Sequence, residues 1–222
     1  MTPTREEATR MSAETAVSIA LGTGLGVLLA AAVIPSWVPS LRATLSGPEP
    51  KAFWYLSRAS GVVAFVLLWA SMLAGLGMST RLAREWPGAR RAFDLHQHFS
   101  LVGLAFSAVH ALLLLGDRTV LFGLVDIALP FASPDVAVGL GQLAFYAFIV
   151  ISVSFWLKRD IGQRAWKLIH RATFLVFAVA LAHGLLAGSD ALLGLYLAAA
   201  GSVTFLTVLR VAAPSTSTRA AH

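Results

Sequence analysis

Six apolar stretches of about 20 residues each limit what this sequence can fold into, because that is the length an α-helix needs to cross a bilayer. Only 13% of the 222 residues are charged, whereas a soluble domain has about a quarter. We therefore predict an all-α integral membrane protein, a bundle of six transmembrane helices. The predicted spans are residues 15–37, 53–77, 95–115, 138–157, 168–188 and 190–210.

These stretches divide the chain into three parts. We expect an N-terminal arm over residues 1–14, one membrane domain over 15–210 and a short tail over 211–222. The first apolar run could be a signal peptide, but its core is longer than that of a typical signal, and we expect a retained span. The connector 116–137 has an apolar centre between acidic residues and prolines, which indicates a short helix lying in the membrane interface.

Basic residues gather on one side of this topology. If the N-terminus is inside, 13 of the 17 Lys and Arg residues lie on the inner side. This positive-inside bias predicts that both termini are cytoplasmic. It also explains the net charge of +6 without nucleic acid, which we do not expect as a partner.

The absence of cysteine excludes several kinds of site. With no Cys in the sequence, the chain has no disulfide, no thiolate metal site, no iron–sulfur cluster and no c-type haem attachment.

Two histidines stand on the third predicted span. His96 and His110 are 14 residues apart, which on an α-helix is about 21 Å along the axis and within about 40° of one face. Ionisable side chains are costly inside a membrane and are candidates for function. His170 and His183 form a similar pair on the fifth span.

The third and fifth spans run in the same direction, so the four histidines fall at two matched depths. His96 and His170 lie at the inner level, and His110 and His183 at the outer level. Two axial imidazoles fill the coordination sphere of a haem iron. We therefore predict two b-type haems, one above the other, with these four histidines as iron ligands. A proton relay or a transition-metal site in a haem-free transporter is the alternative use of the same residues.

Two points about the ligands stay open. His170 and His183 are 13 residues apart, which puts them about 140° out of phase on an ideal helix. The fifth span must be tilted, locally overwound or approach its two haems from different sides. His98 could replace His96, although its spacing of 12 residues to His110 gives a poorer phase.

Haem propionates are anions and need cations. Arg91 and Arg171 adjoin the inner level and Arg58 adjoins the outer level, so we predict that they contact the haems. Arg91 and Arg171 also serve as topology signals, and snorkelling to the headgroups is the alternative for Arg58. Trp166 could line a haem edge or simply pack.

Three segments together resemble the ferric reductase-like transmembrane domain, and the resemblance covers about residues 53–210. This superfamily includes NADPH oxidases, ferric reductases and the haem subunit of a periplasmic methionine sulfoxide reductase system. The resemblance implies that His96, His110, His170 and His183 are axial ligands of two b haems. The segments are WYLSRASG, LHQHFSLVGLAFSAVH and AWKLIHRATFLVFAVALAHG.

The sequence departs from the larger members of that superfamily. They continue into a domain that binds FAD and NAD(P)H, whereas here about a dozen residues follow the sixth span and no dinucleotide fingerprint is present. We expect a cytoplasmic-side donor, namely a separate flavoprotein or a quinol, with FMN or FAD either at the cytoplasmic face or on the partner. The expected outer acceptor is a ferric or cupric chelate, oxygen or a partner reductase.

Two further expectations follow from this comparison. A haem-binding anchor subunit of a reductase complex, with no substrate of its own, is the alternative role. The resemblance to short bacterial members, together with the lack of a transit segment, predicts the plasma membrane of a prokaryote.

Overall fold

All regular secondary structure in the part that the computed structural model describes is helical. That part comprises residues 12–37, 51–80, 82, 87–117, 120–188 and 192–212. Its elements are α1 (Ala13–Trp37), α3 (Ala52–Ser79), α4 (Ala89–Leu113), the 3-10 turn η2 (Leu114–Gly116), α5 (Leu124–Ala128), α6 (Val136–Ser154), α7 (Lys158–Ile161), α8 (Gln163–Arg171), α9 (Thr173–Ala187) and α10 (Leu193–Ala212).

Six helical segments of this part are long and apolar enough to cross a membrane, when α8 and α9 are counted as one. No strand occurs within the described ranges. The predicted six-helix membrane fold is therefore confirmed, and the chain is an integral, multi-pass membrane protein. The predicted arm and tail, including His222, lie almost entirely outside the described residues.

The observed bounds differ from the predicted ones mainly at basic ends. α4 begins at Ala89, six residues before the predicted span, and so includes Arg90 and Arg91. α6 ends at Ser154, three residues earlier than predicted. The longer α4 has a simple reason, because hydropathy marks the membrane core, whereas a helix can extend past it into the polar region.

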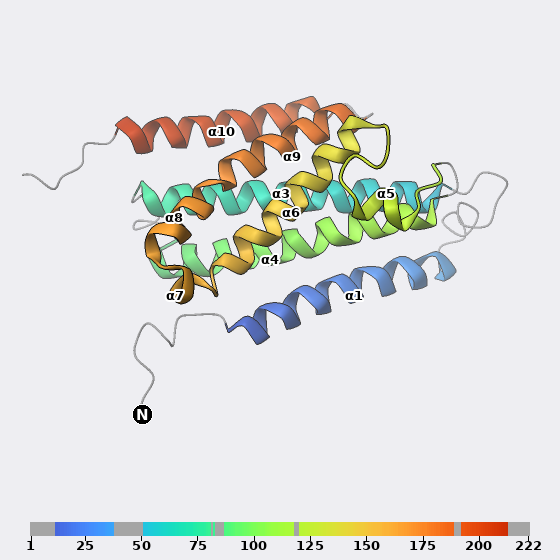
Figure 1. Ribbon diagram of the computed structural model, residues 1–222, viewed down its shortest axis with the longest axis horizontal. Helices are drawn as coiled ribbons and strands as arrows, with labels where there is room; N and C mark the ends of the chain where they lie inside the picture. The colour runs from blue at the N-terminus through green and yellow to red at the C-terminus, as the bar shows by residue number, and fades with distance from the viewer. Residues whose placement is uncertain are drawn as a thin grey trace, which may run out of the picture.

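The two helices at the centre are α3 and α4, which pack closely along their lengths. α6 and α9 cross them obliquely and pack on each other, while α10 lies on α3 and α1 lies on α4 (Figure 1). Phe65, Leu68, Phe148, Phe177 and Val203 belong to a buried core shared by α3, α6, α9 and α10. The crossing of these four helices thus fixes the bundle.

The two ends of the bundle carry different short elements. α7 and α8 lie at one end and α5 lies at the other, and both the start of α1 and the end of α10 lie at the α8 end (Figure 1). An even number of spans requires that the first span begins and the last span ends on the same side of the membrane. That this side is cytoplasmic stays a prediction from charge.

The connector before α6 contains the short helix expected there, α5. The buried side chain of Gln142 on α6 donates to the carbonyls of Asp126 and Ile127, each over 2.7 Å, and accepts from the backbone N–H of Phe131. The hydroxyl of Tyr146 donates to the Ala128 carbonyl over 2.6 Å. Side chains of α6 therefore hold α5 in place.

Candidate functional site

Four histidine rings meet as two pairs between α4 and the α8–α9 segment. The rings of His96 and His170 have their centroids 6.0 Å apart, with an interplanar angle of 82°. The rings of His110 and His183 are 6.1 Å apart, at 70°. The structure thus brings together the residues that the sequence paired by depth.

His98 does not take part in either pair. Its side chain is exposed, whereas the ring of His96 is partly buried and faces His170. Of the two histidines near the start of α4, His96 is therefore the one in the pair.

The fifth span is not one continuous helix, and its break falls between the two histidines. It breaks at Ala172, so His170 lies on α8 and His183 on α9. The Ala172 N–H donates to the carbonyl of Ile169, three residues back, over 3.0 Å. Bonds of this kind tighten the helix toward three residues per turn. Local overwinding, one of the three options left open by the sequence, is therefore present at this break.

Three of the four imidazoles donate a hydrogen bond from Nδ1 to a backbone carbonyl. His110 Nδ1 lies 2.7 Å from the Ser57 oxygen, His96 Nδ1 lies 2.9 Å from the Ser71 oxygen, and His183 Nδ1 lies 2.7 Å from the Ala137 oxygen. A carbonyl oxygen can only accept, so the proton is on Nδ1. Each Nε2 then keeps its lone pair for a metal.

The hydroxyls of the same two serines add a second contact. Ser57 Oγ lies 3.1 Å from His110 Nδ1 and donates to the His110 carbonyl over 3.0 Å. Ser71 Oγ lies 3.0 Å from His96 Nδ1 and 2.7 Å from the Ser100 hydroxyl. Both serines are buried, with 1% and 4% of their surface exposed. Each one therefore holds its histidine with both the backbone and the side chain.

Glycines make room for the same three rings. A Cβ atom on Gly61 would lie 2.9 Å from His110 Nδ1, and one on Gly141 would lie 2.8 Å from His183 Cε1. A Cβ on Gly75 would meet His96 Cε1 at 3.4 Å. The rings of His110 and His183 thus lie directly against helix backbone, in space that a side chain would fill.

This support has a sequence signal that the histidine spacing alone does not show. α3 carries serine and glycine four residues apart twice, at Ser57 with Gly61 and at Ser71 with Gly75. The two copies are 14 residues apart, as His96 and His110 are on the neighbouring helix. Because α3 and α4 run antiparallel, each copy meets one histidine.

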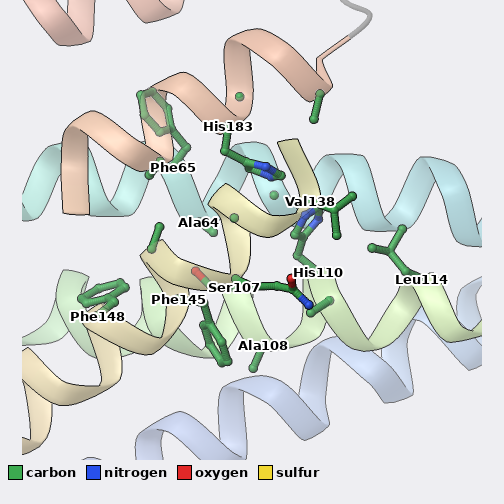
Figure 2. Close-up of a pocket in the computed structure, with 18 of the residues that line it drawn as sticks. Ala64, Phe65, Ser107, Ala108, His110, Leu114, Val138, Phe145, Phe148 and His183 are labelled. Carbon is green, nitrogen blue, oxygen red and sulfur yellow. The ribbon is translucent and has the colours of Figure 1, made fainter. Parts of the chain in front are cut away.

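A cavity of about 500 Å³ surrounds the His110–His183 pair. Figure 2 shows His110 on α4 and His183 on α9 directed into this space, with Phe65, Phe145 and Phe148 along its walls. Leu124 and Ile127 of α5 also line it. Ligand pockets have volumes of about 300–1,000 Å³ and mostly apolar walls, so this cavity suits an apolar ligand with a few polar groups.

The three predicted arginines differ in position. Arg58 is partly buried and lines the cavity, with its Cζ 4.5 Å from the centre of the Trp54 ring. Of the described residues that line the cavity, Arg58 is the one whose side chain is a cation at neutral pH. Arg91 and Arg171 are exposed on α4 and α8, near the His96–His170 pair. The structure thus places Arg58 at the site and the other two at its surface.

Aromatic side chains flank the His96–His170 pair. The Trp166 ring stacks on the His170 ring, with centroids 5.2 Å apart and planes 18° apart. Lys158 Nζ lies 4.5 Å from the centre of the Trp166 ring. The indole N–H groups of Trp156 and Trp166 are buried and have no hydrogen-bond partner among the described residues. A hydrogen-bond acceptor on a group bound at this end would satisfy these two indole N–H groups.

Comparison with known proteins gives one family. The family model described as ferric reductase like transmembrane component matches residues 60–181, which is more than half of the chain. No curated protein and no solved structure matches the chain.

Proposed function

Because the chain belongs to the ferric reductase-like transmembrane component family, we propose that it transfers electrons across a membrane through two b haems, each bound between two histidines. The membership indicates transmembrane electron transfer in general. The haems, their ligands and the redox partners are the proposal. It rests above all on the spacing between the paired imidazole rings.

Two imidazoles on opposite sides of one metal ion have a fixed separation. A metal–imidazole nitrogen bond of about 2.0–2.1 Å, with the ring centre about 1.1 Å further on, puts the two ring centres about 6.3 Å apart. The observed separations are 6.0 and 6.1 Å. Both pairs therefore have the spacing of two axial ligands.

Two protein ligands leave the rest of the coordination sphere to another group. No cluster of three or more His, Asp or Glu side chains suited to a metal ion occurs in the described ranges. A porphyrin supplies four equatorial nitrogens and needs two axial ligands, which is what each pair offers. The donor set thus fits haem better than a metal site made of protein alone.

The surrounding residues support the same reading. Carbonyl groups of Ser57, Ser71 and Ala137 hold three imidazoles with Nε2 free, and such hydrogen bonds increase the basicity of the ligand. The walls of the cavity are mostly apolar, and Arg58 in its wall can pair with an anionic propionate. Bound at these two positions, haem would supply two one-electron centres at different depths of the membrane.

We assign the His96 end to the cytoplasm because most Lys and Arg residues of the sequence lie on that side. The donor on that side is a separate flavoprotein, a flavin such as FMN or FAD, or a quinol. The outer acceptor is a ferric or cupric chelate, oxygen or a partner reductase. We propose the plasma membrane of a prokaryote as the location.

Liposomes test this proposal. The haem-loaded chain is placed in vesicles that enclose a membrane-impermeant ferric chelate, and a flavin reductase with NADH and FMN is added outside. We expect reduction of the enclosed chelate with the wild type and with His98→Ala, and none above empty vesicles with His110→Ala. Vesicles of randomly oriented wild type that reduce no more than empty ones would contradict the proposal.

Reduction of the haems without reduction of the chelate would favour the other role. The chain would then be a haem-binding anchor subunit that passes electrons only to a protein partner.

A further inference from the structure

His170 is supported differently from the other three histidines. His96, His110 and His183 each donate from Nδ1 to a carbonyl and lie against a glycine. The described residues provide neither contact to the ring of His170. Something else must therefore fix the plane of this imidazole if it is to serve as a ligand.

The end of α6 explains the difference. This helix gives His183 both the Ala137 carbonyl and the space above Gly141. His170 lies thirteen residues before His183. The corresponding position on α6, thirteen residues after Gly141, is Ser154, where α6 ends. Ser154 Oγ donates to the Ile151 carbonyl of the same helix over 2.7 Å. α6 thus ends at the level where the support for His170 would be needed.

Trp166 occupies the position beside His170. The two residues are four apart on α8, so they lie on one face of that helix. Their rings are 18° from parallel with centroids 5.2 Å apart, which is a stacked arrangement.

Two further contacts hold the indole itself. Lys158 Nζ lies 4.5 Å from the centre of the Trp166 ring, and a cation at that distance from an aromatic ring is attracted to it. The Phe155 ring meets the same indole edge-on, with centroids 6.5 Å apart. The Trp166 ring is therefore held from the end of α6 and the start of α7 while it stacks on His170.

We propose that Trp166 is the positioning residue for His170. Its stacked ring fixes the plane of the imidazole and takes the place of the carbonyl and glycine that hold the other three ligands. This inference rests on the proposed haem ligation. It makes the His96–His170 centre the one whose sixth coordination position opens when a single aromatic ring is removed.

Carbon monoxide binding to the reduced haem-loaded protein tests this role. Two axial imidazoles leave no position for carbon monoxide, whereas the loss of one opens a position. We expect Trp166→Leu to bind about one carbon monoxide per chain, with a matching loss of the low-spin signal of one haem. Wild type and Trp166→Phe, which keeps a stacking ring, are expected to bind none.

Trp156→Leu is the matched control, because Trp156 is a second partly buried tryptophan whose indole N–H has no partner among the described residues. It is expected to behave as wild type. If Trp166→Leu does not accumulate, Trp166→Met, which also lacks an aromatic plane, carries the same expectation.

Three results would overturn the inference. They are carbon monoxide binding by Trp166→Phe equal to that of the leucine variant, an equal effect of Trp156→Leu, and no effect of either non-aromatic variant at Trp166. In each case the wild type still binds two haems, and the proposed function stands. A wild type that binds no haem would overturn both proposals.

Discussion

The ring of His110 lies 6.1 Å from the ring of His183, and both rings donate from Nδ1 to backbone carbonyls of neighbouring helices, at Ser57 and Ala137. The two residues are 73 positions apart in the sequence. Their Nε2 atoms are left to face a shared cavity of about 500 Å³. The predictions below follow from this arrangement and from its counterpart at His96.

Alanine at Gly61 should remove the haem at the His110 end. The new Cβ would lie 2.9 Å from His110 Nδ1. Because this Cβ is fixed to the backbone of α3, the imidazole ring is the group that must move. We expect haem content to fall from about two to about one per chain, because overpacking forces the ring out of place. The pyridine haemochrome assay on purified protein measures this.

Gly201→Ala provides the control for this substitution. A Cβ at Gly201 on α10 would meet no atom within 4 Å, and alanine favours a helix by about 1 kcal/mol over glycine. Haem content should therefore not change. A loss of haem equal to that of Gly61→Ala would show that small-residue packing in general, rather than the contact with His110, is responsible.

Removal of the Ser57 hydroxyl should have only a mild effect. Ser57→Ala keeps the carbonyl that binds His110 Nδ1 and removes the Oγ contact to the His110 carbonyl. We expect a loss of about 0.5–1.5 kcal/mol in stability and an unchanged haem count. Thermal unfolding and haem content measure the two effects. Loss of one haem would mean that the hydroxyl, and not the carbonyl, fixes the ring.

His96 and His98 provide a matched pair on α4. His96→Ala should remove the haem at the α8 end, because the structure pairs His96 with His170. His98→Ala should keep both haems, since its side chain is exposed. Optical spectra of the oxidised and reduced forms distinguish the two variants. Haem loss only in His98→Ala would reverse the assignment.

The charge of Arg58 should raise the reduction potential of the haem near His110. Arg58 lines the cavity around that pair, and a nearby cation favours the reduced form, which carries one positive charge less. Arg58→Gln should therefore lower this potential in a redox titration. Arg91→Gln, an exposed change near His96, should leave it unchanged. Equal shifts in both variants would contradict a local role for Arg58.

Gln142 should control the opening of the segment around α5. Gln142→Leu removes three hydrogen bonds, to Asp126, Ile127 and Phe131. Carbonyls left without a partner cost about 1–3 kcal/mol each when buried, so faster amide exchange is expected over residues 120–132. Tyr146→Phe removes a single bond to Ala128 and should have a smaller effect. Unchanged exchange in Gln142→Leu would show that packing alone holds α5.

The sequence was sufficient to predict the helical membrane fold and the pairing of histidines by depth. Both follow from short-range patterns, namely apolar length and the rise of 1.5 Å per residue. Local overwinding was only one of three options for the fifth span, and the sequence did not indicate that it occurs at Ala172. The bounds of α4 were underestimated because its basic first turns extend beyond the apolar core.

The supports of the histidines could not be predicted in the same way. A carbonyl such as that of Ala137 has no sequence signature, and its contact with His183 depends on the register of α6 against α9. The serine–glycine pair on α3 does have one, but it becomes meaningful only when α3 is known to lie beside α4. Trp166 was expected either to line a haem or to pack, and its stacking on His170 required the structure.

Haem stoichiometry of the purified chain tests the central proposal most directly. The chain is expressed with a saturating haem supply, and the pyridine haemochrome assay is combined with a reduced-minus-oxidised spectrum. The account predicts about two b haems per chain, both low-spin, and about one in His110→Ala, because each histidine pair binds one iron. A wild type without b haem, or a His110→Ala variant that keeps both, would contradict it.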